Sequence, residues 1–544
     1  MRLSMNALMS IRGFVRAANR AGFWIVLAGA VAALAACGTL AAADQPHWGT
    51  PWTRNMVSAE KNLPDGFQAG KRNTETGEIE LPPDSGVRWT ARLGGQAYGT
   101  PIVAGGRVLV GTNNEQPRDP KYEGDRGVLM CFDEKTGEYL WQLNLPKFTK
   151  VKWADWHYVG ISSPPVVEGR KAYLVSNRAE VLCIDMDGMA NGNDGPFTDE
   201  ARLFAGEGKP PVELGPHDAD ILWRFDMPER LSVEPHNAAN CAVLIDGDLM
   251  YICTSHGVEW THKYVVTPTA PTLIVLDKRN GRLLARDDFG IGPDIVHGQW
   301  SSPAMGIVGG KKQLCLGAGN GRVYAFAPLD PALIPAEAPP APEGSMPDGE
   351  IPRLKNLWQF NGQPLAQTQD DVPMDHQHDT TSYIVTAVPV YHNDRVYVPI
   401  TQEVFHNLKL GWLVCLDAAG QGNITRTGLK WSYETIAGSV STVAIADGLL
   451  YAAGFDGKLH CLDAETGRVH WVHHCGKPIW ASPLVADGKV YLGTGSQTFW
   501  ILRHGKQLEV IQRIRMPSGV YCTATAANGT LFIAAQKNLF AVGK

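Results

Sequence analysis

The feature that most constrains this chain is a short motif that recurs eight times between residues 98 and 544. Each copy has a small or hydroxyl residue, a short apolar run, a turn with glycine, and an apolar run ending in Gly, Ser or Thr. Turns such as Asp447-Gly448 and Asn528-Gly529 strongly indicate β-hairpins. The closest copies lie about 40 residues apart, which suits a unit of four short strands. The copies begin at Tyr98, Ile161, Ala239, Trp300, Thr386, Val440, Trp480 and Tyr521.

A second motif lies in the other half of the unit. Residues 131–141 read Cys-Phe-Asp-Glu-Lys-Thr-Gly-Glu-Tyr-Leu-Trp, and residues 461–471 read Cys-Leu-Asp-Ala-Glu-Thr-Gly-Arg-Val-His-Trp. The Asp side chain can accept hydrogen bonds from its own turn, Gly can take a positive φ, and Trp can bury its indole between neighbouring sheets. Other copies are degraded, or reach Trp223, Trp358 and Trp431 only after insertions.

The two ends of the repeat region complement each other. Residues 538–544 form a third strand with no fourth strand after it, whereas residues 85–90, which include Trp89, form a fourth strand with no unit before it. Pairing of these ends would close a ring and remove exposed sheet edges. The sequence therefore predicts an all-β fold: an eight-bladed β-propeller of four-stranded antiparallel blades, closed by an N-terminal strand.

The Asp-turn-Trp motif resembles the tryptophan-docking repeat of the pyrroloquinoline-quinone (PQQ) propeller superfamily, and the resemblance covers residues 86–544. That superfamily contains quinone-dependent dehydrogenases and also non-catalytic scaffolds such as the outer-membrane assembly lipoprotein. The resemblance therefore implies the fold and leaves both kinds of function open.

The N-terminus predicts export. Basic residues precede an apolar stretch at residues 21–36, as in a signal peptide. Residues 34–38 look like a bacterial lipobox in which Cys37 would be lipidated; the alternatives are cleavage near residues 41–43 or an uncleaved anchor. We divide the chain into an export signal of lipoprotein type (1–37), an N-terminal extension (38–85) and the propeller (86–544). A Pro-rich insertion interrupts the propeller at residues 328–353, and the expected location is the periplasm or cell envelope, with a lipid anchor.

Charge and cysteine usage exclude some classes of protein. The net charge is -6 and no basic run occurs, so there is no case for nucleic-acid binding. No Cys-x-x-Cys-His is present, so a c-type haem is not indicated. The cysteines after Cys37 fall on strand positions and should be core residues, and only Cys241 and Cys253, on the two arms of one hairpin, could pair.

Alignment of the eight units places an aromatic-rich ring at the entrance of the central channel. Tyr98, Trp300, Trp480 and Tyr521 occupy equivalent positions, and the residues two places further on are mostly small hydroxyls. This ring could stack a flat ligand such as a quinone, or it could simply pack between sheets. The long loops should share the same face, which makes that face the functional candidate.

Imidazoles are enriched on the same face. His157, His236 and His297, with Gln299, fall on or next to these loops, and we count them with the aromatic ring as candidate cofactor-binding residues. His376 and His378 would point the same way in extended chain and are candidate metal ligands. Asp185 and Asp187, in an oxygen-rich turn on the opposite face, are candidate calcium ligands, although a polar turn explains them equally well.

Two hypotheses follow. The resemblance to the dehydrogenase branch implies a ligand-binding protein with PQQ and calcium, and a possible oxidoreductase for an alcohol or sugar. No residue matches that branch's calcium-binding Glu and Asn or its Asp base, so the catalytic residues stay unknown. The alternative is a membrane-tethered scaffold whose loop face binds an envelope protein or a glycan.

Overall fold

The computed structural model describes residues 43–334, 351–367, 382–402 and 410–544. The predicted export signal, Cys37, most of the Pro-rich insertion, and His376 and His378 lie outside these residues. Within them, no helix has the length and apolar character needed to cross a membrane.

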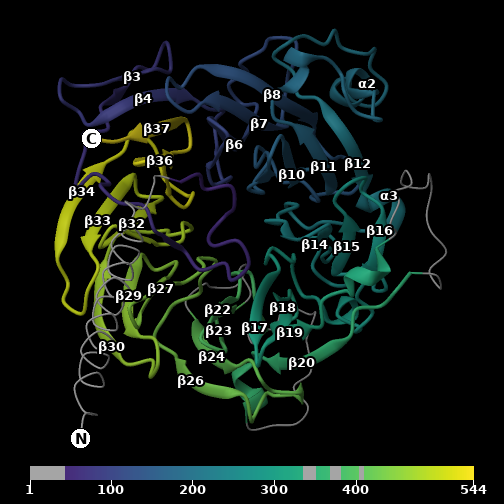
Figure 1. Cartoon of the computed structure of the whole chain (residues 1–544), viewed down its shortest axis with the longest axis vertical. Coiled ribbons are helices and arrows are strands. Elements are labelled where there is room, and N and C mark those ends of the chain that lie inside the picture. The colour runs from purple at the N-terminus through teal and green to yellow at the C-terminus, as the bar shows by residue number, and fades with distance from the viewer. Residues whose placement is uncertain (1–42, 335–350, 368–381, 403–409) are drawn as a thin grey trace, which may run out of the picture. The chain divides into compact units, whose positions relative to one another are not determined.

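Residues 44–544 form one compact unit built from eight antiparallel sheets. The sheets follow one another in chain order around a common axis, with the fourth strand of each blade on the outside (Figure 1). Blades 1 to 4 consist of β5 (Ile102–Ala104), β6 (Arg107–Asn113), β7 (Arg126–Asp133) and β8 (Tyr139–Pro146); β9 (Val166–Glu168), β10 (Lys171–Val175), β11 (Glu180–Asp185) and β12 (Ile221–Asp226); β13 (Leu244–Asp246), β14 (Leu249–Cys253), β15 (Leu273–Asp277) and β16 (Leu283–Arg286); and β17 (Ala304–Val308), β18 (Lys311–Gly317), β19 (Arg322–Phe326) and β20 (Asn356–Asn361). Blades 5 to 8 consist of β22 (Val390–His392), β23 (Arg395–Gln402), β24 (Gly411–Asp417) and β26 (Leu429–Tyr433); β27 (Ala444–Ala446), β28 (Leu449–Ala453), β29 (Lys458–Asp463) and β30 (Val469–His474); β31 (Leu484–Ala486), β32 (Lys489–Thr494), β33 (Thr498–Arg503) and β34 (Val510–Arg515); and β35 (Thr525–Ala527), β36 (Thr530–Ala534), β37 (Asn538–Val542) and β4 (Val87–Arg92).

The remaining elements are short additions to this ring. Three of them extend blades: β21 (Tyr383–Ile384) pairs with β23, while β1 (Val57–Ser58) and β25 (Gly422–Asn423) run parallel to β31 and β20. The others are the hairpin of β2 (Lys71–Arg72) and β3 (Ile79–Glu80), the helices α2 (Glu200–Ala205) and α3 (Met227–Leu231), and single 3-10 turns at Gly188–Asn191, Gly292–Asp294, Pro331–Leu333 and Pro364–Gln367.

The eight-bladed ring and its closure are confirmed. β4 pairs antiparallel with β37, and Trp89 lies opposite Ala541. In Figure 1 the purple strand β4 lies next to the yellow strand β37 beside the C-terminus.

Tryptophans join successive blades through one repeated contact. The indole N–H of a fourth-strand Trp donates to a backbone carbonyl in the Asp turn of the next blade, as Trp89 does to Glu134 at 2.9 Å. The Asp133 carboxylate accepts from the backbone N–H groups of Lys135 and Thr136, which shapes that turn. Gly137 has a φ of 72°, and a Cβ there would lie 2.5 Å from the Trp89 ring. The pairs in the described residues are Trp89–Glu134, Trp141–Met186, Trp223–Lys278, Trp358–Ala418, Trp431–Ala464 and Trp471–Gly505, the last in a turn of blade 7 that carries no Asp.

An N-terminal segment, residues 44–60, closes one end of the channel and is called the plug here. Figure 1 shows it in purple inside the ring. It hydrogen-bonds to all eight blades, starting with Gln45 on Val103 of blade 1 and ending with Glu60, which accepts from the Gly529 N–H of blade 8. Arg54 is fully buried and donates to the carbonyls of Ala242, Val243 and Pro303. The partners in blades 2 to 7 include Val167, Ile245, Met305, Tyr391, Ile445 and Val485.

The cysteines are core residues, as predicted. All nine between Cys131 and Cys522 are buried free thiols. Cys241 and Cys253 are neighbours, but they do not form the disulfide that the hairpin spacing allowed: the backbone N–H of Cys253 lies 3.3 Å from the Cys241 sulfur.

Candidate functional site

A cavity of about 450 Å³ occupies the channel mouth on the side of the long loops, with the plug beneath it. Ligand sites of roughly 300–1,000 Å³ are typical of proteins, so this cavity is large enough for a small molecule. Two groups of side chains dominate its wall. Its aromatic residues are Trp48, Tyr98, Trp156, Trp300, Trp480 and Tyr521, and its hydroxyl residues include Thr100, Ser162, Ser302, Thr386, Ser482 and Thr523.

Three aromatic side chains form one cluster across the closure of the ring. The ring centroid of Tyr98 lies 5.6 Å from that of Tyr521 and 6.0 Å from that of Trp480. Trp480 keeps 39% of its surface exposed, so part of its indole is available to a ligand. Burial raises the pKa of Tyr98 to about 12, which keeps its phenol neutral at physiological pH.

The hydroxyl residues connect neighbouring blades beneath the aromatic ring. The Thr442 N–H donates to Ser482, and the Ser482 N–H donates to Thr523. On the other side of the ring, the Ala242 N–H donates to the Ser302 hydroxyl at 2.8 Å. Each of these hydroxyls thus accepts a hydrogen bond from the backbone of the preceding blade, which accounts for small hydroxyl residues at this repeated position.

Three loops bring three imidazoles together at the edge of the cavity. His236 precedes β13, His262 lies between β14 and β15, and His297 precedes β17. The ring centroids of His236 and His262 are 4.5 Å apart, and those of His236 and His297 are 4.6 Å apart. His297 also lines the cavity and packs edge-on against Trp300 at 4.9 Å.

Two glycines permit this close approach of the loops. A Cβ on Gly257 would lie 2.6 Å from the His236 Cβ, and a Cβ on Gly298 would lie 2.7 Å from the Trp300 indole nitrogen. Contacts this short do not occur between real Cβ atoms and their neighbours, so larger residues would push the loops apart. The histidine cluster therefore depends on both glycines.

Burial sets the protonation of the cluster. It lowers the pKa of His236 to about 4 and that of His297 well below its ordinary value, because a charged imidazole would lose its hydration there. The neighbouring imidazoles act in the same direction. Both rings are neutral at pH 7.

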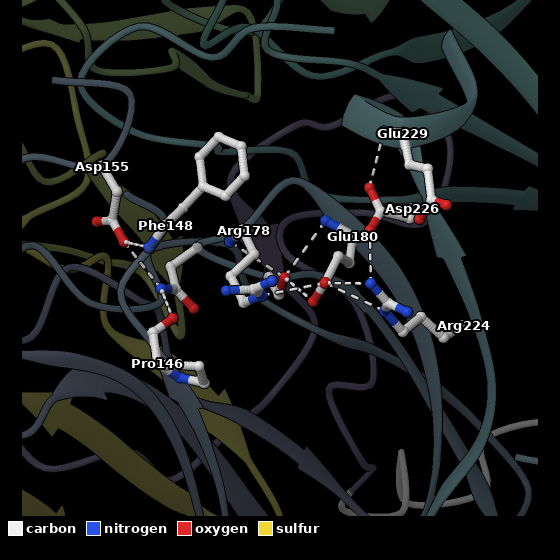
Figure 2. A network of polar contacts seen from close by, with 10 residues as sticks. Pro146, Phe148, Asp155, Arg178, Glu180, Arg224, Asp226 and Glu229 are labelled. Carbon is white, nitrogen blue, oxygen red and sulfur yellow. Dashed lines mark hydrogen bonds and ion pairs between the residues drawn. The ribbon is translucent and has the colours of Figure 1, made fainter. Parts of the chain in front are cut away.

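A polar network includes Asp155, the residue before Trp156 (Figure 2). Asp155 accepts from the backbone N–H of Phe148 and from the Asn177 side chain at 2.9 Å. In the same turn as Asn177, Arg178 donates to Glu180, whose carboxylate also accepts from Arg224 (Figure 2). Burial raises the pKa of Asp155 to about 6, since the opposing effects of Lys147 and Asn177 are smaller.

The structure gathers most of the predicted cofactor-binding residues but not all of them. Tyr98, Trp300, Trp480, Tyr521 and His297 line the cavity, and His236 contacts His297. His157 is exposed and packs beside Trp153, 5.1 Å away. Gln299 is fully buried and donates to the Thr272 hydroxyl instead of lining the cavity.

Asp185 and Asp187 lie in the turn after β11, away from the cavity lining. Arg107 and Arg170 both pair with the Asp187 carboxylate, and the Asp187 N–H donates to Asp185. In this structure the Asp187 carboxylate therefore pairs with two guanidinium groups.

The site also contains residues that were not named as candidate ligands, among them Trp48, Trp156 and Asn240. Trp48 belongs to no repeat, so alignment of the units gives it no position. The sequence already placed His262 with His236 and His297 among the imidazoles of this face, and the structure brings the three together.

Comparison with known proteins agrees with the repeat. A family model described as outer membrane protein assembly factor BamB matches residues 74–147 and 409–508, about a third of the chain, and these segments contain both complete Asp-turn-Trp motifs. The matched segments are similar to that family and agree with the predicted PQQ-type repeat. No curated protein sequence matches it.

Solved structures with a similar fold are distant in sequence from this propeller. BamB from Moraxella catarrhalis is 12% identical (TM-score 0.49; 84% of this chain and 97% of that chain covered). The computationally designed Ika8 protein is 12% identical (TM-score 0.46; 82% and 97% covered). Quinohemoprotein alcohol dehydrogenase from Comamonas testosteroni is 13% identical (TM-score 0.44; 92% and 81% covered).

The residues of the cavity do not fit PQQ and calcium. PQQ is a tricarboxylate, and burying its charges requires paired cations. Calcium requires several oxygen ligands, usually including carboxylates. Among the described residues that line the cavity, none is Arg, Lys, Asp or Glu.

Proposed function

We propose that this protein is an exported propeller that binds an uncharged, hydroxyl-bearing ring, such as a sugar unit of a glycan, in the cavity at its channel mouth. The observation that carries the proposal is a wall of aromatic and hydroxyl side chains with no Arg, Lys, Asp or Glu among its described residues. Export rests on the basic and apolar leader sequence at residues 1–37.

The chemistry of the wall matches such a ligand. Exposed indole surface on Trp480 offers a flat apolar face against which the carbon face of a sugar ring can pack. Asn237 and Asn240 lie in the same wall and can donate to and accept from ligand hydroxyls. A neutral ligand would bury no charge in this cavity. PQQ would bury its carboxylates there without a cationic partner among the described lining residues.

Calorimetric titration of the purified protein, without its leader, against neutral monosaccharides and disaccharides tests this proposal, with PQQ plus Ca²⁺ as the competing ligand. We expect saturable binding of a neutral sugar with one site per chain. Trp480→Ala and Trp300→Ala should each weaken binding at least tenfold, about 1.4 kcal/mol. Trp260→Ala is the matched control, because Trp260 is exposed and lies outside the cavity lining. Stoichiometric binding of PQQ, or equal loss in all three variants, would overturn the proposal.

A scaffold function is the second candidate, and exposed aromatic residues on the loops favour it. Trp156, Trp260 and Tyr264 are 42%, 50% and 58% exposed. Aromatic residues are enriched where proteins bind other proteins. If this candidate holds, Trp260→Ala should weaken binding of an envelope protein in a pull-down and leave sugar binding unchanged.

A further inference from the structure

We propose that His236, His262 and His297 form a binding site for one divalent transition-metal ion, zinc being the best fit. Their ligand nitrogens all lie within 4.8 Å of one another. Zinc binds imidazole at about 2.0–2.1 Å, so tetrahedral ligands lie about 3.3 Å apart. Modest rotation of the rings brings the three nitrogens to that separation.

The hydrogen bonds of His236 orient it as a metal ligand. Its Nδ1 lies 2.9 Å from the carbonyl oxygen of Val258. A carbonyl can only accept, so Nδ1 carries the proton and Nε2 carries the lone pair. That Nε2 is buried and has no hydrogen-bond partner among the described residues. Metal-binding histidines commonly donate their other N–H to a backbone carbonyl in this way.

The turn that presents His262 is fixed by Glu259. This carboxylate accepts from the backbone N–H of Thr261 at 2.7 Å and from that of Lys263 at 3.0 Å. His262 sits between them with a φ of 62°, a left-handed conformation that the turn has to hold in place. Glu259 is therefore a positioning residue for the third imidazole.

The donor set points to a particular class of metal. A set of three imidazoles suits zinc, copper, nickel or iron, whereas calcium and magnesium prefer oxygen ligands. His297 also lines the cavity, so a metal bound by this cluster would lie at the edge of the cavity. Zinc sites with three protein ligands and an open position polarise a bound water or hydroxyl.

The metal site stands independently of the proposed sugar binding, because its ligands come from three loops and need no other ligand. The sequence already suggested that imidazoles converging on this mouth, His236, His262 and His297 among them, could bind a metal or shuttle protons, but it named His376, His378, Asp185 and Asp187 as the metal-ligand candidates. The structure narrows the site to three particular histidines.

Metal binding by the full mature chain, stripped with a chelator, tests the inference. Co²⁺ titration should give intense visible absorption typical of four-coordinate cobalt, saturating at one ion per chain, and Zn²⁺ should displace it. His262→Ala changes a half-buried loop residue and should weaken Zn²⁺ binding at least 100-fold. His236→Gln, which keeps a polar side chain, should do the same.

The control is His474→Ala, which removes an exposed histidine outside the cluster and should leave metal binding unchanged. Zn²⁺ binding of unaltered affinity in His262→Ala and His236→Gln, both folded by circular dichroism, would overturn the site. Absence of stoichiometric Co²⁺ absorption would do so as well. Sugar titration of the metal-free protein separates this outcome from failure of the proposed function.

Discussion

Trp89 lies opposite Ala541 in the sheet that joins the two ends of the propeller. The same indole donates to Glu134 in the first blade, so one side chain contributes to the closing sheet and to the contact between blades 8 and 1. Stability of the ring should therefore depend strongly on this residue.

Trp89→Ala should destabilise the protein by about 3–5 kcal/mol, because it removes a large buried side chain and its hydrogen bond. Chemical denaturation measures the change, and Trp260→Ala, at an exposed position, should cost less than about 0.5 kcal/mol. Equal effects of the two substitutions would mean that closure does not rely on Trp89.

Gly137→Ala tests the docking of Trp89 on the next turn. Gly137 and Gly106 have similar φ values of 72° and 75°, but a Cβ on Gly106 would meet nothing within 4 Å. Gly106→Ala should therefore cost only the left-handed strain of about 1–2 kcal/mol. Gly137→Ala should cost clearly more, because its Cβ would clash with the indole. If both variants unfold at the same denaturant concentration, the indole does not press on this turn.

Arg54→Met tests the plug. The substitution keeps an unbranched side chain but leaves the carbonyls of Ala242, Val243 and Pro303 without the donor that they have now. We expect a loss of roughly 2–4 kcal/mol in the free energy of unfolding. Arg468→Met, at an exposed position, is the control. An unchanged transition in Arg54→Met would show that the plug adds nothing to stability.

The raised pKa of the buried Asp155 carboxyl should make the free energy of unfolding depend on pH. Its pKa is raised to about 6 in the folded chain, so its contribution to stability is fully present below the unfolded pKa and is lost as the pH rises through about 6. Asp155→Asn cannot ionise. Its free energy of unfolding should rise relative to that of the native protein by up to about 3 kcal/mol between pH 4 and pH 7.

The measurement is the difference in unfolding free energy between variant and native protein at each pH. A change in hydrogen bonding caused by the substitution would shift this difference equally at every pH, so only its variation with pH reports on ionisation. A pH-independent difference for Asp155→Asn would refute the raised pKa.

The repeat made the fold and the aromatic ring predictable. Because equivalent positions in a propeller point the same way, alignment alone brought Tyr98, Trp300, Trp480 and Tyr521 to one cavity. Residues outside the repeat have no equivalent positions to align, so their place in the fold could not be predicted. Trp48 and Arg54 precede the first blade, and only the folded ring places them on the channel axis. The histidine cluster depends on loop paths that Gly257 and Gly298 allow, and periodicity does not encode those paths.

The most direct test of the central claim is a crystallographic map of the protein soaked with its tightest-binding neutral sugar. We predict density for a sugar ring inside the cavity, against the indole of Trp480 or Trp300. Density only on the outer loops, beside Trp260 and Tyr264, with an empty cavity would contradict the claim.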